Sequence, residues 1–557
     1  MNKSSPARVA GILAAAVLTA LTLAGAANAQ ATHSQGAAAK AADTVDHVTI
    51  TTPTRVYEPR RSCASLASLD YSNTTISSAT EVAATTSTPA YCDVQASVTN
   101  PPAYTDTVNI GVFLPVQDWN GAFEGTGGGG FDGGDPTTPD ASALQDGYVT
   151  AGTDAGHTGS TGNFALNADG TLNWQEIDDF GYLGIHEMTV LAKAVTAAYY
   201  NKAPAYSFFN GCSTGGRQGL IEAQRYPQDY NGIAAGSPAI NSNLLRASQI
   251  WGFLQMDIAN DVLPQCKLDA FNSAAVAACG EKLDGVADGI ISDWQHCDFD
   301  PRTLIGTVTP CGTITATDAE VVSRIWQGPV DADGHRLWYG LMPGASFTGL
   351  DDTVTTGSTT TAAPFSIVTA WYQYWLTQNP NYNWQTMTYQ QFLNFYQQSA
   401  SEFSGLDVTS ESSPDLSAFK KDGGKIIMWI GTYDQLVYPL GDLNYFKRVE
   451  ATFGGAGGGA AQTAQFLRFF MAPGVEHCGG GPGATPVNAF QAVVNWVEDG
   501  HAPAQLEGEA TNAAGQVDMT RPVCMYPLVA RYNGGNPDVA RSFSCATSLS
   551  PEQLPSS

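Results

Sequence analysis

The sequence predicts an α/β protein interrupted by a large insertion. Short β-type segments alternate with helical ones from about residue 47 to 240. The pentapeptide Gly-Cys-Ser-Thr-Gly at 211–215 stands between a strand pattern and a helix pattern. Buried-strand patterns return at 423–431 and 466–471 after a long stretch that lacks this alternation. Alternating strands and helices are typical of a sheet covered by helices.

Apolar periodicity justifies each predicted element in turn. Runs of β-branched and aromatic residues indicate strands, and apolar residues three or four positions apart indicate helices. The expected strands are 108–114, 148–151, 206–209, 423–431 and 466–471, and the expected helices are 184–200 and 216–223. The glycine-rich stretch 454–459 predicts a flexible loop.

The N-terminus has the features of a secretory signal. Basic residues precede an apolar run over 9–24, and small residues suited to signal peptidase end it at 27–29. We predict a signal peptide at 1–29, a flexible mature N-terminus at 30–45, and a secreted protein, extracellular or periplasmic. The apolar run is too short to span a membrane comfortably, so no membrane partner is expected.

Composition divides the chain and limits its partners. The α/β pattern covers 46–240 and 419–557, and we expect 241–418, rich in Trp, Tyr, Gln, Asn and Thr, to form an inserted domain. Only 14% of the 557 residues are charged, yet the formal net charge is −27. This balance repels nucleic acid and anionic membranes, so neither is expected as a partner.

A serine, an aspartate and a histidine occupy positions typical of an acyl-transfer site. Gly-x-Ser-x-Gly between a strand and a helix allows a strained turn that lifts the Ser213 hydroxyl above the sheet. Asp434 and His477 follow the predicted strands 423–431 and 466–471 in the expected chain order. We predict that Ser213 is the nucleophile, His477 the base and Asp434 its orienting carboxylate. The alternative is a turn aspartate and a surface histidine.

Such a site also needs backbone N–H groups aimed at the developing oxyanion. One normally comes from the residue after the nucleophile, here Thr214. The second is expected from the glycine run at 127–130, where the absence of side chains permits close approach. Gly129 and Gly130 are the preferred donors, and a flexible loop is the alternative interpretation.

Two of the ten cysteines adjoin these residues, since Cys212 precedes Ser213 and Cys478 follows His477. A disulfide holds its Cα atoms about 4.4–6.8 Å apart. If these two sulfurs are joined, the serine hydroxyl and the imidazole are held near hydrogen-bonding range. An even number of cysteines in an exported chain favours complete pairing.

Several longer motifs resemble the tannase and feruloyl esterase family. They lie at 179–182, 211–218, 223–227, 232–239 and 473–483. The similarity covers most of the chain after residue 46 and implies an α/β-hydrolase core with a lid domain. It also implies the triad described above and a Cys212–Cys478 disulfide. Leu183-Gly184 departs from the Arg-Ala that is usual in this family.

The resemblance further implies a calcium site in the inserted domain. Acidic residues and glycine turns at 281–290 offer the hard oxygen donors that Ca²⁺ prefers, and a solvated acidic turn is the alternative. By resemblance, the ligands are the carboxylates of Glu281, Asp284 and Asp288 and the carbonyls of Val286 and Ile290, with Glu281 replacing the more usual Asp. The distance in sequence from the triad favours a structural role. No organic cofactor is expected.

The other cysteines are paired by position. Cys279 and Cys297 bracket the acidic loop, which predicts a disulfide between them. The remaining predicted pairs are Cys266–Cys311, Cys63–Cys92 and Cys524–Cys545.

Taken together, the residues and the resemblance imply a serine carboxylesterase acting on phenolic acid esters of the feruloyl type. Gallate esters and mono(2-hydroxyethyl) terephthalate are alternatives, as is an inactive relative that binds polyphenol or carbohydrate. No Lys or Arg lies between Arg336 and Lys420, which argues against a substrate with a free carboxylate. Aromatic residues at 371–392 favour a small aromatic ester, free or linked to plant polysaccharide or polyphenol. His157 either lines the cleft or is structural.

Overall fold

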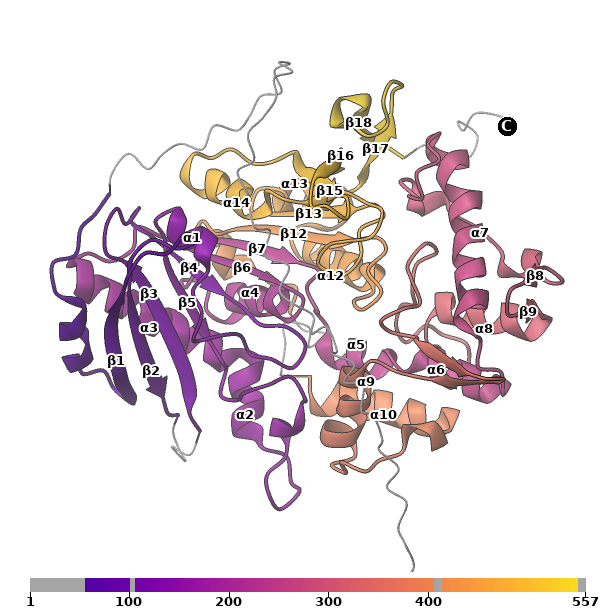
Figure 1. Cartoon of the computed structure of the whole chain (residues 1–557), viewed down its shortest axis with the longest axis horizontal. Helices are drawn as coiled ribbons and strands as arrows, with labels where there is room; N and C mark the ends of the chain where they lie inside the picture. The colour runs from indigo at the N-terminus through magenta and orange to yellow at the C-terminus, as the bar shows by residue number, and fades with distance from the viewer. Residues whose placement is uncertain (1–55, 101–105, 405–412, 549–557) are drawn as a thin grey trace, which may run out of the picture. The chain divides into compact units, whose positions relative to one another are not determined.

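A nine-stranded mixed sheet forms the framework of the protein (Figure 1). The computed structural model describes residues 56–100, 106–404 and 413–548, which all belong to the compact unit 39–557. The predicted signal peptide and flexible mature N-terminus lie outside the described residues. In spatial order the strands are β1 (Thr74–Val82), β2 (Tyr91–Val98), β3 (Val108–Pro115), β5 (Val149–Thr153), β4 (Ala122–Thr126), β6 (Tyr206–Cys212), β7 (Gly232–Gly236), β12 (Lys425–Gly431) and β13 (Leu467–Ala472).

The sheet changes from antiparallel to parallel along its width. Strands β1, β2, β3 and β5 pair antiparallel, whereas β5, β4, β6, β7, β12 and β13 pair parallel. The strands of the parallel half are buried almost throughout, as expected where helices cover both faces. The helices of the described chain before and after the insertion are α1 (Ala141–Gln145), α2 (Trp174–Asp178), α3 (Gly184–Tyr200), α4 (Thr214–Arg225), α11 (Ser417–Lys421), α12 (Pro439–Thr452), α13 (Gly455–Thr463) and α14 (Ala489–Glu498).

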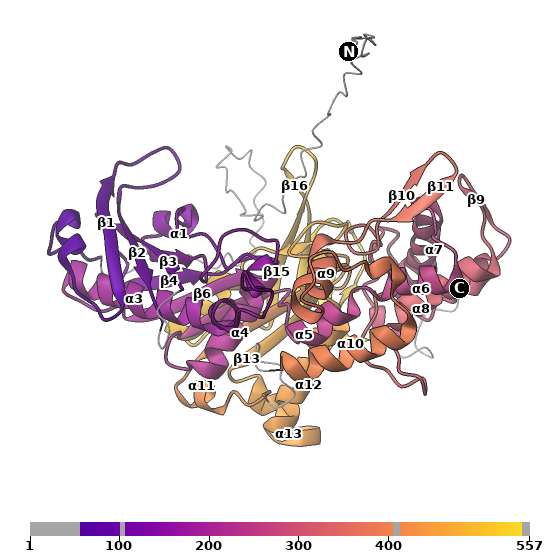
Figure 2. The same ribbon diagram turned by 90° about the horizontal axis from the view of Figure 1, so that it is seen from below.

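The inserted region, residues 241–418, separates two strands that are neighbours in the sheet. β7 and β12 pair in parallel with Gly232 opposite Lys425, so the chain leaves the sheet and returns to the adjacent position. Figure 2 shows the β10–β11 hairpin of this region beside α7. Whether 241–418 is a domain of its own stays a prediction. Its elements are α5 (Ser242–Ser248), α6 (Trp251–Ala259), α7 (Gln265–Asp284), β8 (Val308–Thr309), β9 (Gly312–Thr313), α8 (Ala316–Gln327), β10 (Thr353–Thr356), β11 (Thr359–Ala362), α9 (Ser366–Ala370) and α10 (Tyr389–Glu402).

The predicted strands and helices are all present, with shifted ends. The helix expected at 184–200 is α3, and the one expected at 216–223 begins earlier, because α4 starts directly after the turn at Ser213. Further strands near the C-terminus were not predicted. They are β14 (Thr485–Pro486), β15 (Gln505–Thr511), β16 (Val517–Cys524), β17 (Leu528–Tyr532) and β18 (Phe543–Thr547).

The prediction of a flexible loop at 454–459 is wrong. Helix α13 begins at Gly455 and packs against α12 (Figure 2). A Cβ atom on Gly459 would lie 1.9 Å from the Glu450 carbonyl oxygen of α12. Close packing of this glycine-rich segment against α12 therefore outweighs the low helix propensity of glycine.

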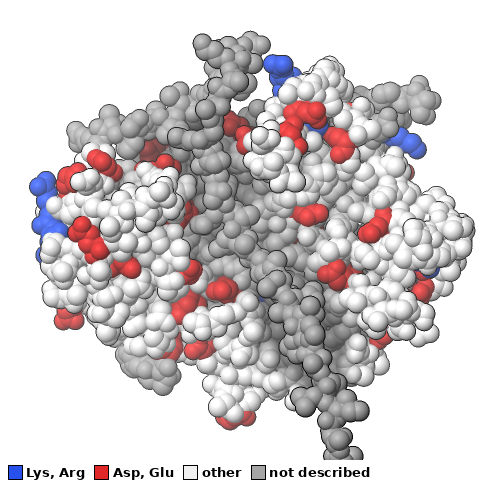
Figure 3. All heavy atoms as spheres, in the orientation of Figure 1, with Lys and Arg blue, Asp and Glu red and all other residues white. Residues whose placement is uncertain are grey.

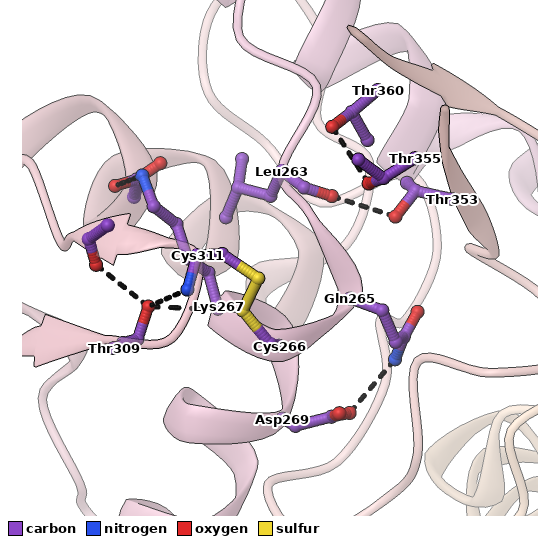
Figure 4. The surroundings of a disulfide bond; sticks show 12 residues. Leu263, Gln265, Cys266, Lys267, Asp269, Thr309, Cys311, Thr353, Thr355 and Thr360 are labelled. Atoms are coloured by element: carbon purple, nitrogen blue, oxygen red, sulfur yellow. Dashed lines mark hydrogen bonds and ion pairs between the residues drawn. A yellow bond between two sulfur atoms is a disulfide. The ribbon is translucent and has the colours of Figure 1, made fainter. Parts of the chain in front are cut away.

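Five disulfides join the ten cysteines in the pairs that the sequence predicted. Figure 4 shows the Cys266–Cys311 bond, which ties the first turn of α7 to the tip of the β8–β9 hairpin. Thr309 closes that tip, because its hydroxyl donates to Gly312 O (2.7 Å) and accepts from Cys311 N–H (3.2 Å).

Acidic side chains outnumber basic ones on the one face of the molecule that Figure 3 draws. On the face drawn in Figure 3, acidic side chains are scattered widely and basic ones are few. Among the described residues, no helix combines the length and the apolar character needed to cross a bilayer.

A buried carboxyl group in the inserted region makes stability depend on pH. Asp351 is 1% exposed, and its Oδ1 atom has no hydrogen-bond partner among the described residues. Burial, and then the charge of Asp352, raises the pKa of Asp351 to about 8. The unfolded chain releases this proton near pH 4, so the folded state alone retains it between about pH 4 and 8. The free energy of unfolding therefore falls as pH rises through this window.

We predict that Asp351→Asn removes this dependence, because asparagine keeps the shape and stays neutral. Relative to the wild type, the variant should gain free energy of unfolding between pH 5 and pH 8, on the order of several kcal/mol. Urea unfolding at both pH values measures the change. Asp333→Asn, at an exposed position of the same region, is the control. If the free energies of unfolding of variant and wild type differ by the same amount at pH 5 and pH 8, Asp351 is not the source of the pH dependence.

Candidate active site

Ser213 occupies a sharp turn between β6 and α4. Its backbone has φ 61°, a left-handed value that is strained for a residue with a side chain. The turn is held because Ser213 N–H donates to Gly236 O (2.9 Å) and Ser213 O accepts from Ala239 N–H (3.0 Å). A Cβ atom on Gly211 would lie 2.6 Å from the Gly215 carbonyl carbon, so the tight turn needs glycine there. The side chain is thereby presented at the end of the strand.

A chain of hydrogen bonds connects Ser213 with the two other predicted residues. His477 Nε2 lies 2.9 Å from Ser213 Oγ, and His477 Nδ1 lies 2.8 Å from Asp434 Oδ2. Asp434 follows β12 and His477 follows β13. The sequence had placed all three on loops after strands, and the structure brings them together. An Nδ1–H bond to the carboxylate leaves Nε2 free to accept the serine proton.

Two backbone donors and a second carboxyl group surround Asp434. This side chain is fully buried, and its Oδ1 atom accepts N–H bonds from Leu436 (2.9 Å) and Val437 (2.7 Å). Asp442 of α12 lies close by, and burial followed by the charge of Asp434 raises the pKa of Asp442 well above its usual range. The raised pKa favours the neutral form of Asp442 next to the site.

The Cys212–Cys478 disulfide connects the strand end before the serine to the loop after the histidine. The two Cα atoms are 6.0 Å apart. Cys478 has φ 59°, a left-handed value like that of Ser213. Of the two strained residues, Cys478 forms the disulfide and Ser213 follows its partner Cys212. The disulfide therefore limits how far the serine hydroxyl and the imidazole can separate.

The glycine loop 127–131 packs against the start of α4. Gly215 N–H donates to Gly128 O (2.9 Å), and Gly128 N–H donates to Gln218 Oε1 (2.9 Å). The N–H groups of Thr214, Gly129 and Gly130 have no hydrogen-bond partner among the described residues. These are the three groups that the sequence proposed for the oxyanion, and they remain available to a ligand.

His157 supports this loop rather than the proton chain. Its Nε2 atom lies 2.6 Å from Phe131 O, and its ring stacks on Phe164 with centroids 3.7 Å apart. Burial lowers the pKa of His157, so the ring is neutral and Nε2–H is the donor. Of the two roles considered from the sequence, these contacts fit the structural one.

The acidic loop of the inserted region lies against the triad loops. Tyr433, which precedes Asp434, donates through its hydroxyl to Gly289 O (3.1 Å) and accepts from Ile291 N–H (3.0 Å). The loop also lines a cleft of about 610 Å³ together with Tyr433 and Glu476, the residue before His477. The long separation in sequence is therefore not a separation in space.

The described donors of this loop fit a hard cation in their chemistry. Burial, and to a smaller extent the charge of Asp288, raises the pKa of Asp284 to about 6, a cost that a nearby cation would relieve. Asp288 Oδ2 is bound to Arg521 Nη2 (2.8 Å), so one of its oxygens is shared. The side chain of Glu281 lies outside the described part of the chain.

Three residues at the site were not predicted. Gln218 lies five residues after the nucleophile. Its Oε1 accepts from Gly128 N–H of the glycine loop, and its Nε2 donates to Gly133 O (3.1 Å) just after the loop. Its place in the motif 211–218 was the available signal. Arg246 of the inserted region donates from Nη2 to Gly130 O (3.2 Å). Arg246 and Asp442 gave no local signal, because their contacts depend on which segments meet in the fold.

The disulfide generates a prediction that does not depend on the substrate. Replacing Cys212 and Cys478 together by alanine should slow the labelling of Ser213 by a fluorophosphonate about 10-fold or more, because small losses of alignment reduce serine reactivity strongly. The thermal midpoint should fall in this variant and in a Cys63→Ala/Cys92→Ala control, but only the control should label normally. Normal labelling of the Cys212/Cys478 variant would contradict the geometric role of this bond.

Comparison with known proteins agrees with this architecture. Residues 92–546 match the family model described as tannase and feruloyl esterase. A probable feruloyl esterase of Arthroderma benhamiae is 42% identical over 452 residues, which cover 79% of this chain and 83% of the relative. The crystal structure of feruloyl esterase B from Aspergillus oryzae has 26% identity and a TM-score of 0.73, covering 87% of this chain and 99% of that one. Tannin acyl hydrolase from Aspergillus niger has 22% identity and a TM-score of 0.76, covering 89% and 98%, and shows the same fold. The chain therefore belongs to the tannase and feruloyl esterase family.

Proposed function

We propose that this carboxylic ester hydrolase cleaves phenolic acid esters through a covalent acyl-serine. Ser213 Oγ attacks the ester carbonyl while His477 Nε2 takes its proton, and Asp434 stabilises the resulting imidazolium. His477 then returns the proton to the departing alcohol, and water releases the acid by the same steps. The continuous contact from Ser213 Oγ through His477 to Asp434 carries the proposal.

Family membership supports the class of substrate. The 42% identical relative is named a probable feruloyl esterase, and we infer that the acyl group here is of the hydroxycinnamoyl type. The substrate is an aromatic ester, free or linked to plant polysaccharide or polyphenol. The fold does not separate ferulate from gallate, because feruloyl esterase B and tannin acyl hydrolase share it with this chain.

The aromatic residues of the inserted region divide into two groups. Trp371, Tyr372 and Trp375 are at most 2% exposed and pack within the protein, so they do not offer open stacking surfaces. Tyr374, Tyr382 and Trp384 are only partly buried. The partly buried rings are the candidates for contact with an aromatic substrate.

We also propose secretion, supported by the N-terminal signal pattern, and a structural calcium ion in the acidic loop. Asp284, Asp288 and the neighbouring backbone carbonyls would hold the ion, with Glu281 as a further ligand. Calcium would supply charge neutralisation and rigidity to a loop that binds Tyr433. No step of the reaction is assigned to it.

Ser213→Ala tests the enzymatic proposal. Loss of the nucleophile should lower kcat by roughly 10⁶-fold, as removal of the serine does in other triad hydrolases, while the thermal midpoint stays close to that of the wild type. Hydrolysis of methyl ferulate and methyl gallate is followed for both proteins. If the wild type hydrolyses methyl ferulate faster than methyl gallate, the acyl group is of the hydroxycinnamoyl type. If it hydrolyses methyl gallate faster, the protein is a tannase instead. If the Ser213→Ala protein is folded and its turnover is undiminished, Ser213 is not the nucleophile.

Calcium binding is tested by thermal unfolding of chelator-treated protein. Adding CaCl₂ should raise the midpoint, because a ligand that binds only the folded state stabilises it. Asp284→Asn should remove most of this rise, whereas Asp298→Asn, at an exposed position of the same region, should retain it. Elemental analysis without calcium, together with an unchanged midpoint, would end the proposal.

A further inference from the structure

Three consecutive carbonyl groups of the glycine loop are held by hydrogen bonds. Gly128 O accepts from Gly215 N–H (2.9 Å), and Gly129 O accepts from Asp132 N–H (2.8 Å). Gly130 O accepts from the Thr214 hydroxyl (2.7 Å) and from Arg246 Nη2 (3.2 Å). Because a trans peptide is planar, fixing a carbonyl fixes the N–H of the next residue. The three carbonyls therefore orient the N–H groups of Gly129, Gly130 and Phe131 in turn. These bonds therefore set the directions of the N–H groups that the loop can offer to an oxyanion.

The third of these carbonyls differs from the other two. Backbone N–H groups hold Gly128 O and Gly129 O, whereas side chains alone hold Gly130 O. Gly130 also has φ 62°, in the left-handed region that glycine enters and leaves at little cost. The peptide after Gly130 is thus the part of the loop whose orientation depends most on side-chain partners.

Arg246 approaches this peptide from the inserted region. It lies on α5, is 4% exposed, and is oriented by a bond from Nε to Ser242 Oγ (2.8 Å). Its guanidinium carbon is 4.2 Å from the centre of the Phe131 ring and 5.9 Å from that of Trp371. The cation is thus enclosed by aromatic faces, where a hydrogen bond to a carbonyl is stronger than in water.

Other residues of the inserted region complete this enclosure. A Cβ atom on Gly130 would lie 2.5 Å from Ile367 Cδ1 of α9. Trp375 stacks on Phe131 with ring centres 5.6 Å apart and an angle of 17° between the rings. The glycine loop is therefore packed between the start of α4 on one side and the inserted region on the other.

We propose that Arg246 is a positioning residue for ester hydrolysis. Together with the Thr214 hydroxyl, it holds the carbonyl of Gly130. It thereby fixes the backbone of the residue whose own N–H is a candidate oxyanion donor. The inserted region thereby completes the oxyanion-binding geometry. This inference rests on the proposed acyl-serine reaction and adds to it a residue that acts through the loop without touching the substrate.

Steady-state kinetics of Arg246→Gln and Arg246→Lys test this role. The interaction matters most when charge develops on the ester oxygen, so kcat should fall about 10-fold or more in Arg246→Gln while KM changes little. Arg246→Lys, which keeps the charge but loses the planar fork, should be intermediate. Arg324→Gln, a surface cation of the same region that pairs with Glu320, should match the wild type.

Inhibitors separate positioning from a general disturbance of the site. An aryl trifluoromethyl ketone adds to the serine and carries the oxyanion, whereas ferulate binds without one. In Arg246→Gln, the inhibition constant of the ketone should rise by the same factor as kcat falls, and that of ferulate should stay constant. An equal rise for both inhibitors, or an unchanged kcat, would overturn the proposal.

A double-mutant cycle with Thr214→Val tests whether both side chains hold the same peptide. Either donor alone should retain part of the geometry, so the double variant should lose more activity than the product of the two single losses. Independent, multiplicative losses would contradict a shared role. If Arg246→Gln fails to fold, the kinetics of Arg246→Lys test the proposal instead. A kcat equal to that of the wild type would overturn it, and a reduced kcat with an unchanged KM would support it.

Two different results distinguish loss of the acyl-serine reaction from loss of the positioning role. Retained turnover in folded Ser213→Ala would remove the acyl-serine reaction itself. A normal Arg246→Gln enzyme, measured on whichever ester the wild type hydrolyses, would remove only the positioning role.

Discussion

Parallel register through β6, β7, β12 and β13 sets where the candidate site lies. Cys212 pairs with Gly236, Gly236 with Trp429, and Gly431 with Ala472, so these strands end at one edge of the sheet. The serine, the aspartate and the histidine all leave the sheet at this edge. A slip of one residue would turn the side chains of a strand to the opposite face, and the proton chain could not form.

Backbone strain at this edge is held by bonds from several segments. Ser213 and Cys478 both have left-handed φ values, and the disulfide, the β7 carbonyl and the loop after β7 hold them in place. Asp434 is likewise fixed by two backbone N–H groups, and burial raises the pKa of Asp442 beside it. The geometry is thus present before any substrate binds, which is the condition for electrostatic stabilisation of a transition state.

Local signals predicted several strands and helices and the three residues that the hydrogen bonds connect, and they failed where packing opposed them. Gly-x-Ser-x-Gly, the chain order and the strand patterns depend on near neighbours in sequence, so they located Ser213, Asp434 and His477. The glycine-rich segment 454–459 predicted a loop. Helix α13 forms there because glycine, which has no Cβ atom, lets the segment pack closely on α12. The contacts of Arg246 and Asp442 have no local signature, since their partners lie in other segments.

The sequence by itself determined which residue types stand at the ends of β6, β12 and β13, and that strands and helices alternate on both sides of a long insertion. Tertiary structure alone decided that the inserted region reaches Gly130 through Arg246 and Tyr433 through Gly289. The physical reason is the distance along the chain over which each kind of interaction acts. Periodicity and turn chemistry act over a few residues, whereas these contacts exist only after burial of apolar surface has brought distant loops to one place.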